Sequence, residues 1–289
     1  MRSAQAGAAG ASLVVTPELS LCGYPPEDLV LRPGVSRRLR CASFAALAAQ
    51  VRRHTAIVGF PERTQRPAAT TRWRCIRDGR VATGLPQAVP AELHGVRRGA
   101  LFRARRTSPA CSTSTACACA RRHLRGRAGS PDRRAARRRP ARRFVVVPNG
   151  SPYHTRQQAL RREQVVARGR ARTALPIVYV NRVGGQDELV FDGASFVVDA
   201  DGTVVQQLPA WHETVALVDI RRRRCRSRVR GGLDDALEAH VYQALVMGVR
   251  DYVDKNGFPG VLLGLSGGID SALTLAVAVD ALGATACAR

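Results

Sequence analysis

Hydrophobic and polar positions in the first sixty residues predict a strand, a helix and a second strand. Residues 12–19 (SLVVTPEL) begin with an apolar, β-branched run that is typical of a strand, and residues 34–54 carry apolar side chains at helical spacing. Residues 55–60 (TAIVGF) form a short apolar run that indicates a buried strand. Strand, helix and strand with short connections favour an α/β layer fold.

A clear pattern returns at Phe144 and continues to residue 208. The segments predict, in order, a strand ending in a polar turn (144–154), an amphipathic helix (156–175), a strand (176–183) and a hairpin (193–208). An Asp-Gly pair at Asp201-Gly202 between two β-branched runs is a strong hairpin signal.

The last part of the chain predicts a helix, a strand, a glycine turn and a second helix. Residues 234–257 carry acids in the first turn and end at Gly257, as a helix of that length should. Residues 260–265 (GVLLGL) indicate a buried strand, and residues 269–283 an apolar helix.

Residues 72–143 have no hydrophobic periodicity. The segment has few large aliphatic residues, scattered prolines and many arginines. Such a composition buries too little apolar surface to offset chain entropy, so we expect this segment to lack a packed core.

The positive charge is large and uneven. The formal net charge is +24, and Lys255 is the single lysine, so arginine supplies the other 45 of 46 basic residues. Between Arg72 and Arg143 there are 20 arginines against three acids. Such charge suggests a polyanionic partner, yet the runs lack interleaved aromatic residues on which bases would stack. An arginine-rich nucleic-acid binder on an α/β scaffold therefore stays an alternative, and we expect no specific nucleic-acid partner.

The eight cysteines do not form a recognisable framework. Cys111, Cys117, Cys119 and His123 lie close together, but their spacing matches no common structural zinc pattern, so we expect no metal site there. No secretory signal and no uncharged apolar stretch of membrane-spanning length is present, which predicts a cytoplasmic protein without a membrane partner.

The string LGLSGGIDSA (263–272) carries candidate nucleotide chemistry. Two adjacent glycines after an apolar strand let the backbone turn tightly, and the N–H groups of the loop and helix start can face an anion. The serine hydroxyls suit phosphate oxygens, and Asp270 could orient the loop or a metal-bound pyrophosphate. We predict an ATP-binding loop made of Gly264, Leu265, Ser266, Gly267, Gly268, Ile269, Asp270 and Ser271. The string resembles the pyrophosphatase-type loop of ATP-dependent amidating ligases.

Three further stretches narrow the resemblance. TPELSLCGYPPEDLVLRPG (16–34), PNGSPYH (148–154) and VNRVGGQDELVFDGASFVVDADG (180–202) resemble, in that order, segments of the glutaminase domain of glutamine-dependent NAD synthetases. This family implies a nitrilase-like αββα sandwich followed by a Rossmann-like ATP-pyrophosphatase domain, of which this chain holds the first strand and helix. Residues 284–289 (ATACAR) depart from the family's next strand. Another pyrophosphatase-loop ligase is the remaining alternative.

The resemblance implies a role for individual residues. Glu18 falls on the general base of a Glu–Lys–Cys triad that hydrolyses glutamine, and Ser151 falls on a glutamine-binding serine. Gln157 stands where the family tends to have a basic glutamine contact. The implied reaction amidates deamido-NAD with ammonia from glutamine, using ATP and Mg²⁺, in a homo-oligomeric enzyme.

Two members of that triad have no counterpart in the sequence. The family's lysine and cysteine strings should fall between residues 62 and 143, but no lysine precedes Lys255 and no cysteine there has the expected surroundings. The simplest hypothesis is that residues of about 84–143 are translated out of frame, in a truncated copy of a larger enzyme. We therefore expect no glutaminase activity.

These resemblances divide the chain into two domains. Residues 1–220 form the nitrilase-like glutaminase domain, which contains the arginine-rich disruption at about 84–143. Residues 221–232 form a linker, and residues 233–289 form the N-terminal fragment of the synthetase domain.

Overall fold

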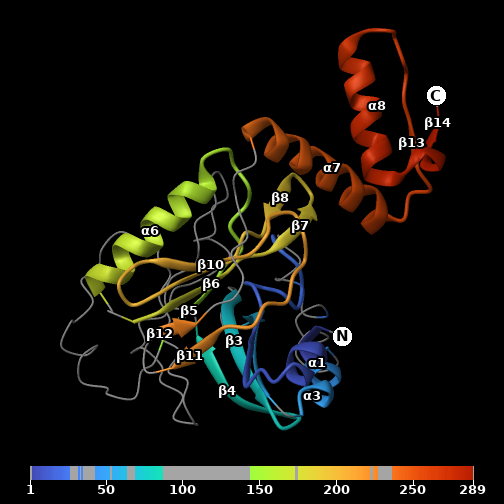
Figure 1. Cartoon of the computed structure of the whole chain (residues 1–289). Helices are drawn as coiled ribbons and strands as arrows, with labels where there is room; N and C mark the ends of the chain where they lie inside the picture. The colour runs from blue at the N-terminus through green and yellow to red at the C-terminus, as the bar shows by residue number, and fades with distance from the viewer. Residues whose placement is uncertain are drawn as a thin grey trace.

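The computed structural model describes residues 2–26, 32, 34, 43–52, 54–63, 69–86, 144–172, 175–221, 224–226 and 236–288. Within them the helices are α1 (Arg2–Ala8), α3 (Phe44–Gln50), α6 (Gln157–Arg172), α7 (Leu237–Asn256) and α8 (Ile269–Leu282) (Figure 1). The strands are β1 (Leu13–Val15), β2 (Thr55–Arg63), β3 (Ala69–Arg77), β4 (Arg80–Pro86), β5 (Val145–Pro148), β6 (Ile177–Val180), β7 (Val183–Gln186), β8 (Leu189–Asp192), β9 (Phe196–Val198), β10 (Val204–Gln207), β11 (Asp219–Arg221), β12 (Arg224–Arg226), β13 (Val261–Leu262) and β14 (Cys287–Ala288).

The first sheet has the order β1-β2-β3-β4 and is covered on one face by α3. β1 pairs parallel to β2, while β2, β3 and β4 pair antiparallel. Alternate residues of β2, namely Ala56, Val58 and Phe60, pack against Phe44 and Ala48 of α3. The two-residue period of a strand therefore places every second side chain of β2 under this helix.

The second sheet has the order β10-β9-β6-β5 and is covered by α6. β5 and β6 run parallel, and β9 and β10 form the hairpin expected around Asp201-Gly202. Val145 and Val147 of β5 belong to one buried cluster with Val165 of α6.

The two sheets pack face to face through the other faces of their strands. Ile57 of β2 and Cys75 of β3 contact Val146 of β5, each between neighbours that point toward a helix. The layers are thus α3, first sheet, second sheet and α6, which confirms the expected αββα sandwich.

One sequence-based expectation was wrong at residues 72–86. β3 and β4 form a hairpin there, with a register shift between Cys75 and Ile76, and Ile76 is buried in the same cluster as Phe44 of α3. The sequence pattern was misleading because arginines occupy positions where an apolar residue would be expected. The aliphatic stem of an arginine can cover apolar surface while its charged end stays exposed. Arg74 illustrates this, since its guanidinium carbon lies 5.3 Å and 4.9 Å from the ring centroids of Phe44 and Phe60. The rest of the arginine-rich segment, 87–143, lies outside the described residues.

Three further elements were not anticipated: α1, the β7–β8 hairpin and the β11–β12 hairpin. β12 falls inside the stretch 221–232 that we expected to be a linker. No periodic signal marks these elements, because each has seven residues or fewer.

α7 lies against the β7–β8 hairpin and joins the sandwich to the last part of the chain (Figure 1). The backbone N–H of Gly185 donates to Oδ2 of Asp251 at 2.7 Å, and Lys255 Nζ donates to the Gly185 carbonyl and to Asp251. Trp211 Nε1 donates to Nδ1 of His240 at 3.0 Å. A side chain at Gly185 would be crowded, since a Cβ would lie 3.2 Å from that of Asp251.

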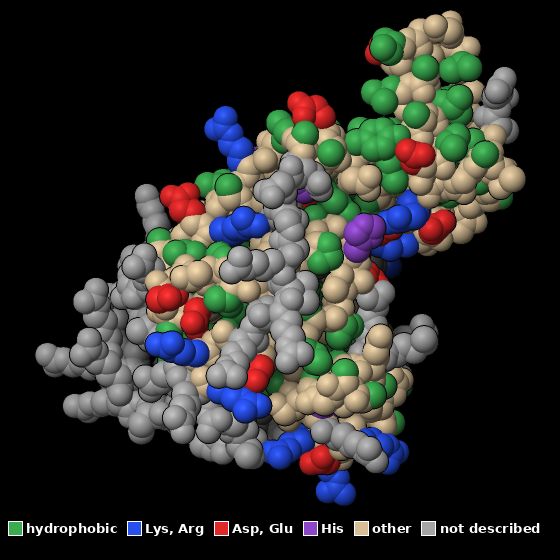
Figure 2. Space-filling view, viewed as in Figure 1, with side chains coloured by type: hydrophobic (Ala, Val, Ile, Leu, Met, Phe, Trp, Pro, Cys, Tyr) green, Lys and Arg blue, Asp and Glu red, His purple; other side chains and the backbone are tan. Residues whose placement is uncertain are grey.

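The C-terminal part forms a small β–α–β unit. β13 and β14 pair in parallel, with α8 between them in sequence. Cys287 and Ala288 form a strand after α8, although residues 284–289 were expected to depart from the family's next strand. Hydrophobic side chains gather on the surface of this unit (Figure 2), where Leu262 is 86% and Ile269 83% exposed. None of the helices in the described ranges is long and apolar enough to cross a membrane.

Replacing Asp251 with leucine should lower the free energy of unfolding by about 1.5–3 kcal/mol, because the Gly185 N–H would lose its charged acceptor. Urea denaturation monitored by tryptophan fluorescence measures the change. Asp254→Leu, at an exposed position of the same helix, is the matched control and should change stability by less than about 0.5 kcal/mol. Equal effects of the two substitutions would contradict the anchoring role of Asp251.

Candidate functional site

The loop after β1 places Glu18 inside the molecule. Thr16 donates from its backbone N–H to the Ile57 carbonyl, which continues the pairing of β1 with β2. Glu18 follows with only 1% of its surface exposed, and its backbone N–H donates to the Asn149 carbonyl at 3.2 Å. The strand register therefore brings the Glu18 loop to the turn after β5.

The turn after β5 is held in place by the neighbouring strand. The Asn149 N–H donates to the Val180 carbonyl at 2.7 Å, and Asn149 Nδ2 donates to the hydroxyl of Tyr179 at 2.6 Å. Gly150 lies against the ring of Tyr24, where a Cβ would be 3.2 Å from three ring atoms. A glycine at this position therefore allows the Glu18 loop and this turn to approach closely.

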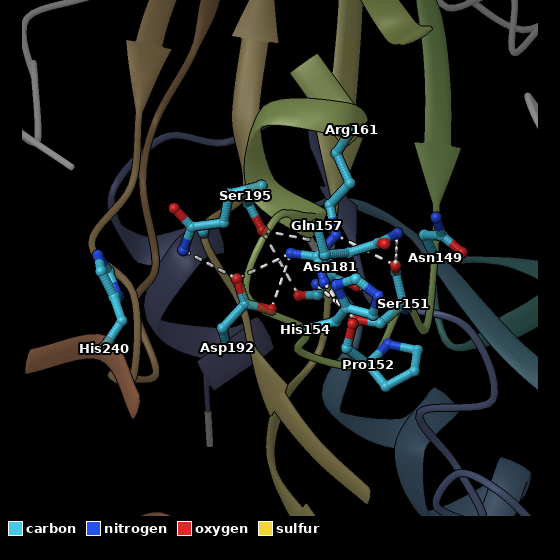
Figure 3. A network of polar contacts seen from close by, with 12 residues as sticks. Asn149, Ser151, Pro152, His154, Gln157, Arg161, Asn181, Asp192, Ser195 and His240 are labelled. Carbon is cyan, nitrogen blue, oxygen red and sulfur yellow. Dashed lines mark hydrogen bonds and ion pairs between the residues drawn. The ribbon is translucent and has the colours of Figure 1, made fainter. Parts of the chain in front are cut away.

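Ser151 lies in the same turn and is 4% exposed (Figure 3). Its N–H donates to Oδ1 of Asn181 at 2.9 Å, and its carbonyl accepts from Nδ2 of that residue at 3.1 Å. Its Oγ accepts from Gln157 Nε2 and from Arg161 Nε, both at 3.1 Å. Ser151 is thus fixed by its own turn, by the end of β6 and by the first turns of α6.

A buried ion pair lies behind Ser151 (Figure 3). Arg161 NH1 donates to both carboxylate oxygens of Asp192, at 2.7 Å and 2.8 Å, and neither side chain is more than 3% exposed. Arg161 NH2 donates to the carbonyls of Ser151 and Pro152. Gln158 Nε2 adds a third hydrogen bond to Asp192 at 3.0 Å.

The structure therefore brings the Glu18 loop to the turn that contains Ser151, although the two residues are 133 positions apart in the sequence. Gln157 is neutral, as the sequence shows. Arg161, one helical turn further along α6, brings a positive charge to this position, because its Nε donates to Ser151 Oγ. Sequence reasoning missed Arg161. The available signal was its position four residues after Gln157, which puts both on one face of the helix.

The β7–β8 hairpin supports the Glu18 loop from the other side. Gln186 accepts a hydrogen bond from the Tyr24 N–H and donates one to the Pro25 carbonyl, both at 3.3 Å. Gly23 has a φ of +86°, and a Cβ there would lie 2.8 Å from Oε1 of Gln186. Phe191 packs edge-on against Tyr24 with ring centroids 5.6 Å apart.

Three of the four described cysteines lack the surroundings of a nucleophile. Burial raises the pKa of Cys22 to about 12, against the lowering effect of Arg182, so this thiol stays protonated although it lies four residues from Glu18. Burial also raises the pKa of Cys225 to about 12. Cys75 packs between the sheets. Cys111, Cys117 and Cys119, with His123, lie outside the described residues.

The glycine turn before α8 has the shape expected of a phosphate loop. Gly267 has a φ of +84°, and Gly268 is the extended residue that caps the helix. The hydroxyls of Ser266 and Ser271 lie 3.1 Å apart, and Ser271 also donates to the Gly268 carbonyl at 2.9 Å. Asp270 lies exposed in the first turn of the helix. Of the predicted loop residues, all but Ser271 are exposed.

The two parts of the fold match two protein families. Residues 132–229 match the carbon-nitrogen hydrolase family, and residues 241–288 match the NAD synthase family. The chain therefore combines a carbon-nitrogen hydrolase sandwich with the start of an NAD synthase domain.

Curated relatives carry the same combination. The glutamine-dependent NAD(+) synthetase of Rhodobacter capsulatus is 41% identical over 295 residues, which cover 98% of this chain and 51% of that protein. The corresponding enzyme of Acinetobacter baylyi is 35% identical, over 95% of this chain and 50% of that protein. The chain belongs to the glutamine-dependent NAD(+) synthetase family and spans about half the length of the curated relatives it matches.

Solved structures agree with this assignment. The glutamine-dependent NAD+ synthetase of Acinetobacter baumannii, solved in complex with ADP, superimposes with a TM-score of 0.81 at 32% identity, over 99% of this chain and 54% of that one. A nitrilase-superfamily amidase from Nesterenkonia AN1 shares the fold alone, with a TM-score of 0.57 at 23% identity over 72% of this chain and 77% of that one. The Acinetobacter baumannii match agrees with the glutamine-dependent NAD(+) synthetase family rather than with the two alternatives.

Proposed function

We propose that the chain carries the glutamine side and the beginning of the nucleotide side of an enzyme that amidates deamido-NAD to NAD with ATP and glutamine. The observation that supports this most directly is the meeting of the Glu18 loop with the Ser151 turn, joined by the bond from Glu18 N–H to the Asn149 carbonyl. Both side chains are buried, as a water-excluding site requires, and both lie in segments that resemble the family.

In this proposal Glu18 is the general base and Ser151 contacts glutamine. A carboxylate can take the proton of an attacking nucleophile only if that nucleophile lies within hydrogen-bond reach. Neither Cys22 nor Cys75 fits that role, because Cys22 is held as the neutral thiol and Cys75 is part of the core. Lys255 is engaged at the α7–β7 contact with Gly185 and Asp251. We therefore expect the hydrolytic step to be impaired in this chain.

The ATP side of the proposal rests on the loop Gly264–Ser271. Its backbone N–H groups and the two serine hydroxyls suit phosphate oxygens at a helix N-terminus. Mg²⁺ commonly binds through one or two carboxylates together with substrate phosphates. Asp270 is the carboxylate in this loop, so it would hold the ion only alongside a bound nucleotide. The ion would neutralise phosphate charge there.

The remaining expectations belong to the same proposal. They comprise the division into residues 1–220, 221–232 and 233–289, a homo-oligomeric assembly, deamido-NAD as the second substrate and a cytoplasmic location. The resemblance supports each of them, and each stays a prediction.

Titration of the full chain with magnesium-ATP by calorimetry tests the nucleotide side. We expect no saturable binding below the millimolar range, because an exposed loop must offset the entropic cost of association with phosphate contacts alone. A matched titration of the Acinetobacter baumannii enzyme is the positive control. A low-micromolar dissociation constant that is lost in Ser266→Ala or Asp270→Ala would show that the loop is a working site by itself.

A further inference from the structure

The hydroxyl of Ser151 has both of its acceptor positions filled. A serine hydroxyl offers one proton and two lone pairs. Gln157 Nε2 and Arg161 Nε each donate to Oγ at 3.1 Å, and both donors are buried. No acceptor for the Ser151 proton is present among the residues that the structure describes. The proton is therefore the one hydrogen-bonding group that this hydroxyl can still offer to a ligand.

Arg161 cannot turn away from Ser151, because its three guanidinium nitrogens make five hydrogen-bond contacts. Nε donates to Ser151 Oγ, the two NH1 bonds go to Asp192, and the two NH2 bonds go to the carbonyls of Ser151 and Pro152. The guanidinium is planar and rigid, so the contacts of NH1 with Asp192 and of NH2 with the two carbonyls fix the direction in which Nε points.

We propose that Arg161, oriented by Asp192, acts with Gln157 to make Ser151 a hydrogen-bond donor toward the bound ligand. The position then selects an oxygen acceptor, either a carbonyl or a carboxylate oxygen, and disfavours an N–H group. This inference rests on the proposed function, under which the acceptor is an oxygen of glutamine. Arg161 and Gln157 are positioning residues, since they act through Ser151.

The first test needs no ligand. Nuclear magnetic resonance of the full chain with ¹⁵N-labelled glutamine side chains follows the Gln157 amide group, which Gln157→Leu identifies by loss of its signal. Because Nε2 donates to Ser151, Ser151→Ala should speed solvent exchange of the Gln157 amide protons by about fivefold, the loss of one hydrogen bond. The other glutamine side chains serve as internal controls. Unchanged exchange at Gln157 would overturn the proposal, because Ser151 would then not be accepting from it.

The second test measures L-glutamine binding by titration calorimetry. Gln157→Glu places an acceptor where the amide donor was, so the carboxylate should capture the Ser151 proton. This variant should bind glutamine at least about tenfold more weakly than Gln157→Leu, which leaves the proton available to the ligand. In a Ser151→Ala background, the difference between the glutamate and leucine variants should shrink, which separates proton capture from simple charge repulsion.

The two tests distinguish the inference from the proposed function. Equal binding by Gln157→Glu and Gln157→Leu would overturn the inference even if glutamine binds the unmodified chain. If the unmodified chain binds no glutamine, the glutamine side of the proposed function fails, and the amide exchange alone decides the donor assignment. Arg161→Lys adds a check on positioning. It keeps the positive charge but removes the planar guanidinium, and it should still weaken glutamine binding.

Discussion

Replacing Asp192 with alanine should lower the free energy of unfolding by about 3–5 kcal/mol, because it leaves the Arg161 charge buried without its partner. Asp192 is fully buried and accepts from Arg161 and Gln158 as well as anchoring a backbone turn through its carbonyl. Urea unfolding at constant pH measures the loss.

Asp219→Ala is the matched control for that experiment. Asp219 also pairs with an arginine, Arg221, but both side chains are largely exposed, so its loss should cost less than about 1 kcal/mol. The double substitution Arg161→Met with Asp192→Leu should recover part of the stability, since it removes both buried charges. Similar losses for Asp192→Ala and Asp219→Ala would show that the buried pair contributes no more than a surface pair.

The full chain should release no measurable ammonia from glutamine. Triad members act as a unit, and removal of a nucleophile or base from such a unit commonly costs about 10⁴–10⁶ in rate. The sequence holds one lysine, Lys255, and the structure engages it with Gly185 and Asp251 rather than with Glu18. A coupled assay for ammonia, run beside the Rhodobacter capsulatus relative, measures the difference.

If the assay did detect ammonia, single Cys→Ala substitutions would show whether one thiol is responsible. Hydrolysis abolished by a single Cys→Ala change at Cys111, Cys117 or Cys119 would identify a nucleophile in the part of the chain outside the described residues. Dependence on Cys22 would contradict the inference that burial holds this thiol protonated, with a pKa of about 12.

The layered sandwich was predictable because its strands and helices have strong periodic signals. Residues 55–60 and 144–148 alternate between a helix-facing and a sheet-facing side, and α6 and α7 are long enough for helical spacing to be evident. The glycine turn was predictable as well, since two adjacent glycines between an apolar strand and a helix have few other uses.

The β3–β4 hairpin and the buried ion pair of Arg161 with Asp192 could not be predicted from periodic patterns. In β3, arginines stand where a strand usually shows polar or β-branched residues, and only the packing of Arg74 over two rings reveals their role. Arg161 and Asp192 are 31 positions apart. In the sequence these two residues look like ordinary charged surface residues, because no local pattern indicates that the fold buries them as a pair.

α7 has a mechanical consequence for the molecule. The helix has 20 residues and is about 30 Å long. One side carries Met247 into the cluster around Trp211, and the adjacent Val246 packs against Val277 of α8. Tyr242 also donates to Asp280 at 2.6 Å. α7 therefore packs against both parts of the protein, so a small rotation of α7 about its axis would move the loop Gly264–Ser271 relative to the sandwich.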